Sequence, residues 1–106
     1  MIDALVAPET LVAVSLETTG LNPFRDRMTE LGAVRFDYAG TLLDTFWERT
    51  DPGIPVPEHV SKLTGIRDEL LAGARTPEAV VQDFFAWAGP EAWLVVHSGE
   101  FEAGFL

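Results

Sequence analysis

Short apolar runs separated by glycine, proline and polar residues follow one another along this chain, and their lengths distinguish strands from helices. The first run, residues 11–17, ends at a Thr-Thr-Gly sequence at 18–20. This is the pattern of a buried central strand followed by a turn. Residues 28–38 and 41–49 predict two more strands, and the Ala-Gly pair between them predicts a hairpin.

Prolines divide the first half of the chain from the second. Residues 51–57 contain three prolines and one glycine, so we expect an extended connector there rather than a helix or a central strand. Two short helical segments are predicted next, at 57–63, where proline occupies the first turn, and at 68–72.

The clearest helix is predicted at residues 77–88, where apolar side chains recur at helical spacing after an N-cap candidate, Thr76. A buried strand at 93–97 and the start of a helix at 100–106 follow. A hairpin joined to a strand–helix–strand unit predicts a mixed sheet with flanking helices. We therefore expect one α/β domain over residues 1–106, incomplete at its C-terminal end because the last helix has only begun.

Composition excludes several classes of site. The chain has no cysteine, which excludes disulfides, thiolate metal sites and cysteine nucleophiles. Its net charge of −10 argues against a broad basic surface for nucleic acid, although a nuclease that holds its substrate through metal ions needs carboxylates instead. No apolar run approaches the roughly 20 residues that span a bilayer, and no basic signal sequence begins the chain. We expect a cytoplasmic location and no membrane partner.

Ser15 and Glu17 are the first candidate site residues. They are two positions apart on the first predicted strand, so their side chains share one face of the sheet. They also lie near the carboxyl end of that strand, where α/β folds place their sites. This spacing suits metal ligands. The three tryptophans lie in apolar segments, which favours core packing over base stacking.

A family resemblance becomes specific at residues 15–21. Their sequence, Ser-Leu-Glu-Thr-Thr-Gly-Leu, resembles the D-x-E-T-T-G-L motif of the DEDD-superfamily 3′-to-5′ exonucleases, in particular the proofreading (epsilon) subunits of bacterial replicative DNA polymerases. Residues 27–34 and 61–66 resemble that family's second strand and its internal Thr-Gly-Ile segment. Residues 97–102, with the Phe-Leu pair at 105–106, resemble its second motif, H-N-x-x-F-D. The resemblance covers essentially the whole chain.

The resemblance implies a ribonuclease-H-like fold and two divalent cations, Mg²⁺ or Mn²⁺, held by four carboxylates for in-line phosphodiester hydrolysis. By position, Glu17 and Glu102 would be catalytic metal ligands, with Glu102 one methylene longer than the usual aspartate. Ser15 takes the place of the carboxylate that bridges both ions. Thr18 resembles the residue that contacts the 3′ hydroxyl, and Leu21 the apolar surface under the terminal base.

Two departures from the family pattern predict impaired catalysis. The neutral hydroxyl of Ser15 cannot offset cationic charge. Mutation of residues that only hydrogen-bond to metal ligands already lowers metal affinity or activity roughly 10- to 100-fold, so loss of a ligand itself should weaken metal binding at least as much. The third motif, a histidine with an aspartate five residues on, is expected beyond Leu106. His97 belongs to the second motif, and we interpret it as a buried or hydrogen-bonded structural residue. His59 lies on a polar helix, and we expect it to be solvated or to pack.

Two functions remain open. The first is a 3′-to-5′ exonuclease domain that acts on nucleic-acid 3′ ends, with DNA favoured over RNA. The second is a non-catalytic relative that binds a strand end or a protein, such as a polymerase or helicase, in a replication or repair assembly. Ser15 and Glu102 favour the second for the chain as written. If the closing helix is absent, an exposed apolar face would also favour a homo-oligomer or a partner chain. A globular domain with no nucleic-acid role would require the ordered matches to be coincidence.

Overall fold

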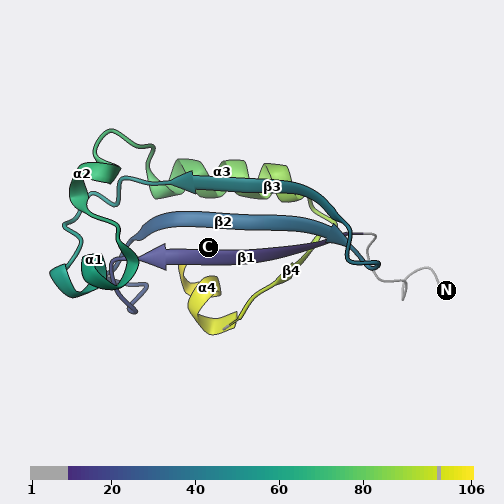
Figure 1. The fold of residues 1–106 in the computed structure, drawn as a ribbon, viewed down its shortest axis with the longest axis horizontal. Coiled ribbons are helices and arrows are strands. Elements are labelled where there is room, and N and C mark those ends of the chain that lie inside the picture. The colour runs from purple at the N-terminus through teal and green to yellow at the C-terminus, as the bar shows by residue number, and fades with distance from the viewer. Residues whose placement is uncertain (1–9, 98) are drawn as a thin grey trace.

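The computed structural model describes residues 10–97 and 99–106, which form a mixed sheet with helices (Figure 1). Four strands make one sheet in the order β3-β2-β1-β4 within this described part. The strands are β1 (Thr10–Thr18), β2 (Met28–Asp37), β3 (Leu42–Arg49) and β4 (Trp93–Val95). The helices are α1 (Glu58–Thr64), α2 (Asp68–Leu71), α3 (Pro77–Ala88) and α4 (Gly99–Phe105).

The sheet combines an antiparallel meander with one parallel strand. Strand β1 pairs with β2, and β2 with β3, both antiparallel, whereas β4 runs parallel to β1 with Val12 opposite Leu94. The turn between β2 and β3 needs glycine, because Gly40 has a φ of 84° in the left-handed region. The predicted hairpin and mixed sheet are confirmed. The predicted connector at 51–57 is likewise free of helix and strand.

One face of the sheet packs against α3 and holds the core. Alternate residues of β1, Val12, Val14 and Leu16, are buried on this face. Phe84 of α3 is fully buried against them, and complete burial of such a ring contributes about 1.5–3 kcal/mol. Phe101 of α4 packs against the same cluster. The core is therefore built by α3 and α4 on a single side of β1.

Both ends of α3 are stabilised by polar contacts, one from the residue that precedes the helix and one from β2. The hydroxyl of Thr76 accepts a hydrogen bond from the backbone N–H of Ala79 at 3.2 Å, so the predicted N-cap is confirmed. At the other end, the guanidinium of Arg35 donates to the carbonyls of Trp87 and Ala88. A cation at this position also opposes the negative end of the helix dipole. These contacts fix α3 across β2.

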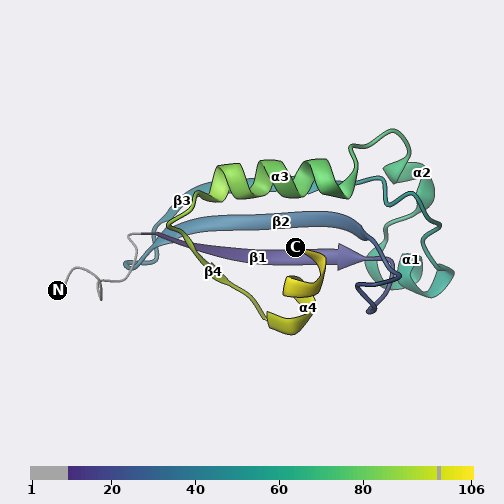
Figure 2. The same ribbon diagram turned by 180° about the vertical axis from the view of Figure 1, so that it is seen from behind.

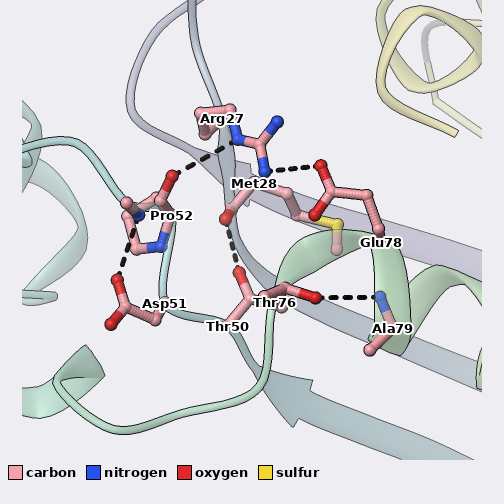
Figure 3. A network of polar contacts seen from close by, with 9 residues as sticks. Arg27, Met28, Thr50, Asp51, Pro52, Thr76, Glu78 and Ala79 are labelled. Carbon is pink, nitrogen blue, oxygen red and sulfur yellow. Dashed lines mark hydrogen bonds and ion pairs between the residues drawn. The ribbon is translucent and has the colours of Figure 1, made fainter.

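The short helices α1 and α2 lie at the end of the sheet where β1 finishes, as both ribbon views show (Figures 1 and 2). They enclose a second, small apolar cluster of Val56, Val60, Ile66 and Leu71. The connector is tied to the sheet because the hydroxyl of Thr50 donates to the carbonyl of Met28 (Figure 3). None of the helices in residues 10–97 and 99–106 is long and apolar enough to cross a membrane.

The sheet face opposite α3, here called the open face, is lined by residues that alternate with the buried ones. A shallow apolar groove of about 420 Å³ runs over it, lined by residues of β1, β2 and β3 that include Ala13, Ser15, Gly32, Val34, Thr45 and Trp47. Trp47 is 56% exposed and Trp93 is 60% exposed, so the prediction that they pack in the core is wrong. Trp87 is half-buried against Phe46 and Arg35.

The strand predicted at 93–97 is shorter than expected and is not buried. It spans Trp93–Val95, and all three residues are exposed. The reason is its place in the sheet, because β4 is an edge strand with β1 on one side only. An apolar run therefore predicted the strand correctly but gave the wrong burial.

Candidate functional site

Ser15 and Glu17 lie on the open face of β1, near its carboxyl end. The alternation that buries Val14 and Leu16 turns Ser15 and Glu17 to the opposite side, as predicted. Ser15 is exposed opposite Gly32, and Glu17 is half-buried opposite Glu30. A bulge follows between Glu17 and Thr18, which bends the strand as it leaves the sheet. The carboxylate of Glu17 is thus accessible from the side of the sheet that α3 does not cover.

The turn after β1 is held by threonine hydroxyls. Thr18 is buried, and its hydroxyl donates to the carbonyl of Gly20 at 2.5 Å. The hydroxyl of Thr19 donates to Asp26 Oδ1 at 3.1 Å and accepts from the backbone N–H of Arg27 at 3.0 Å. Gly20 has no room for a side chain, because a Cβ there would overlap the Asp26 carboxylate. The turn therefore depends on both threonines, the glycine and Asp26.

Leu21 projects from this turn into solvent. Its side chain is 83% exposed, so Leu21 is not part of the core. Thr18, by contrast, is packed in the turn that carries Leu21. Of the two residues that the resemblance assigns to contacts with a terminal nucleotide, Leu21 is exposed and Thr18 is buried.

Glu102 is buried in an apolar pocket between α3, β4 and α4. It is 6% exposed, and its Oε2 has no hydrogen-bond partner among the residues that the structure describes. The pocket, of about 320 Å³, is lined by Phe85, Leu94, Val96, Gly99, Glu102, Ala103 and Leu106. Burying a carboxylate oxygen without a partner is costly, so such an atom indicates a missing cation or donor.

The surroundings of Glu102 differ from those of Glu17. Leu94 pairs with Val12, so the wall around Glu102 belongs to the side of the sheet that α3 covers, whereas Glu17 lies on the open face. Within the described residues, no group of three or more Asp, Glu or His side chains is arranged to hold a metal ion. The oxygen donors suit a hard divalent cation in type, but the described part of the chain does not gather them into one cluster.

The family model that matches this chain is the one described as Exonuclease (RNase_T), and it matches residues 12–106. The chain belongs to this exonuclease family. The matched stretch contains both the β1 site residues and Glu102, and it confirms the family predicted from the motifs.

Relatives of known type support this assignment. The chain is 37% identical over 102 residues to the DNA polymerase III PolC-type of Bacillus subtilis (strain 168), and the aligned region covers 96% of this chain and 7% of that protein. It is 38% identical over 95 residues to the PolC-type polymerase of Halalkalibacterium halodurans, where the aligned region covers 90% of this chain and 6% of that protein. The chain therefore spans less than a tenth of the length of these relatives.

Solved structures show the same fold. The E. coli exonuclease I in complex with a dA16 oligonucleotide superposes with a TM-score of 0.80 at 17% sequence identity, covering 91% of this chain and 22% of that one. An apo form of exonuclease I gives a TM-score of 0.81 at 16% identity, and the superposition covers 92% of this chain and 23% of that one. At this identity the likeness concerns the fold alone, and it confirms the ribonuclease-H-like α/β architecture of this exonuclease-family chain.

The histidines of this exonuclease-family chain are both exposed. His59 is exposed on α1, as expected for a solvated residue. His97 is also exposed, which excludes the buried one of the two structural roles predicted for it. The reason is that β4 ends at Val95, and the chain leaves the sheet before His97.

Glu102 was predicted from the motif alone. Nothing in the sequence pattern predicted that its carboxylate would be enclosed by apolar side chains.

Proposed function

We propose that this chain is a 3′-to-5′ exonuclease domain that hydrolyses the terminal phosphodiester bond of a nucleic-acid strand, DNA in preference to RNA. The observation that carries the proposal is the β1 end, where accessible Glu17, packed Thr18 and exposed Leu21 follow one another in a turn fixed by hydrogen bonds. The family match and the PolC-type relatives, which are DNA polymerases, support the substrate class.

The carboxylates of Glu17 and Glu102 would be ligands of divalent cations, Mg²⁺ or Mn²⁺, with Ser15 as a neutral neighbour of Glu17. In the described arrangement the two carboxylates lie on opposite sides of the sheet, so each would contact its own cation. The unpartnered Oε2 of Glu102 supports this role, because a cation would satisfy it. When bound, such cations activate water and stabilise the leaving oxygen. Ser15 supplies no negative charge, so we propose that cations bind weakly and that turnover is slow. We place the third motif beyond Leu106.

The residues of the turn would position the strand. The hydroxyl of Thr18 can leave its contact with Gly20 and hydrogen-bond a 3′ hydroxyl group. The exposed side chain of Leu21 offers an apolar surface to the terminal base. Positioning of this kind lowers the entropic part of the barrier by holding the scissile phosphate in one place.

The second candidate function is a non-catalytic domain that binds a strand end or a protein in a replication or repair assembly. Two observations favour it. Ser15 is exposed where the family pattern has a charged ligand, and Glu102 lies among apolar side chains rather than beside Glu17. A binding domain would need Thr18 and Leu21 but neither carboxylate.

The deciding experiment is degradation of a 5′-labelled single-stranded oligonucleotide with Mn²⁺ or Mg²⁺. The chain is compared with Glu17→Ala and Ser15→Asp. A ladder from the 3′ end that disappears in Glu17→Ala and grows in Ser15→Asp supports the exonuclease. Absence of cleavage in every form, together with retained oligonucleotide binding, rejects catalysis and favours the binding domain.

A further inference from the structure

Phe24 is the most exposed of the large apolar residues in the described part of the chain, at 99%. An aromatic ring in full contact with water is unusual for a side chain that normally helps to build a core. A single exposed apolar residue needs no explanation by itself, so its surroundings decide whether it has a role.

The loop that carries Phe24 is ordered by its own hydrogen bonds. The side-chain Oδ1 of Asn22 accepts a hydrogen bond from the backbone N–H of Phe24 at 3.0 Å. The backbone carbonyl of Asn22 accepts from the N–H groups of Arg25 at 3.0 Å and Asp26 at 2.7 Å. Asp26 Oδ2 accepts in turn from the N–H of Asn22 at 3.1 Å. Phe24 is therefore held outward by a fixed backbone, which lowers the entropic cost of binding a ligand there.

A pocket of about 370 Å³ adjoins this loop, between it, the first turns of α3 and the end of α4. Phe24 and Arg25 form one side, and apolar groups of Pro77, Val81 and Phe105 form the other. Arg27 and Glu78 also line this pocket, and they form an ion pair with a nitrogen–oxygen distance of 2.5 Å, which Figure 3 draws.

Arg25 is the side chain in this pocket that can meet an anionic ligand. Both oxygens of Asp26 are engaged, by Thr19 and by Asn22, and Glu78 is paired with Arg27. Among the residues that the structure describes, no carboxylate lies within ion-pair distance of Arg25. Within the described residues the guanidinium of Arg25 is thus a cation beside the exposed ring with no ion-pair partner, and guanidinium groups bind phosphate strongly.

We propose that this loop binds an unpaired nucleotide of the strand, with the base stacked on Phe24 and a phosphate at Arg25. The inference rests on the proposed function for the identity of the ligand. Leu21 and Phe24 are three residues apart, so their Cα atoms are at most roughly 11 Å apart. A strand whose terminal base lies on Leu21 brings its next nucleotides to Phe24. Stacking of this kind does not depend on base identity.

The test measures affinity for a fluorescent single-stranded oligonucleotide in a Glu17→Ala background, which prevents cleavage. Phe24→Ala should weaken binding roughly 5- to 150-fold, the loss typical of one base–aromatic stack. Phe24→Trp should restore affinity. Arg25→Gln should reduce the slope of log affinity against log salt by about 0.7, the value for one phosphate contact on a single strand.

Controls separate this inference from folding effects and from the proposed function. Leu63→Ala removes another highly exposed apolar residue, at 86%, from α1 and should leave affinity unchanged. An oligonucleotide with one abasic sugar near its 3′ end should bind less tightly to the parent but equally to Phe24→Ala. If the parent binds and Phe24→Ala binds within twofold of it, the stacking site is wrong while the proposed function stands. If no form binds the oligonucleotide, both are overturned.

Discussion

Replacing Glu102 by methionine should make the folded chain more stable while removing its response to divalent cations. The carboxylate is 6% exposed, its Oε2 has no hydrogen-bond partner in residues 10–97 and 99–106 as described, and the pocket around it is otherwise apolar. An unsatisfied buried polar group costs roughly 1–3 kcal/mol, and methionine fills similar space with no polar atom. The free energy of unfolding should therefore rise by roughly 1–3 kcal/mol in Glu102→Met.

The assay is thermal and urea unfolding, with and without Mg²⁺. For a domain of this size, 1 kcal/mol corresponds to roughly 4–8 °C in Tm, so the change is easily measured. Mg²⁺ should raise the Tm of the parent, because a ligand that binds only the folded state stabilises it, and should leave Glu102→Met unchanged. Glu91→Met, at an exposed position, is the matched control and should change little. A lower Tm in Glu102→Met without metal would refute the reasoning, since it would mean that the carboxylate is satisfied.

Three further predictions concern the scaffold. Phe84→Ala, which removes a fully buried ring from the core, should lower the free energy of unfolding by roughly 3–5 kcal/mol in a urea titration. Gly20→Ala should displace the Asp26 carboxylate, lowering Tm and oligonucleotide affinity together; a variant that retains both would contradict the packing of the turn. The pKa of Glu78 lies below its usual value because a backbone N–H and the guanidinium of Arg27 hydrogen-bond the carboxylate. Since a lowered folded-state pKa stabilises the fold above the unfolded value of 4.5, this contribution should be lost as pH falls below that value. The pair is exposed, so the loss should be at most about 1 kcal/mol, and Glu78→Gln should remove that part of the pH dependence.

The secondary structure was largely predictable because local signals specify it. Pro77 after the N-cap Thr76 and Gly89 after the last turn fix both ends of α3, and the observed bounds equal the predicted ones. Gly40 supplies the left-handed residue that the β2–β3 turn requires. In each case a few residues that are neighbours in the sequence determine where the helix ends or the chain turns.

Burial was less predictable because it depends on what covers each face. Trp47 and Trp93 are apolar residues in apolar segments, yet both lie on the open face, where no described element packs over them. The orientation of Glu102 has the same origin. Its position in the motif follows from the sequence, but the side of α4 that faces β4 and α3 is set by how the helix docks.

The residue at position 15 affects both metal binding and the covering of the open face, because Ser15 itself lines the apolar groove. Any polypeptide that covers the groove must also take the side chain at position 15 out of water. A carboxylate there would make such covering costly unless a cation accompanied it, whereas a hydroxyl needs only one hydrogen bond. Ser15 therefore weakens metal binding and, at the same time, makes the open face easier to cover without metal. If a polypeptide covers the groove without divalent cations, the binding domain is favoured. If the groove is covered only when divalent cations are present, the enzyme is favoured.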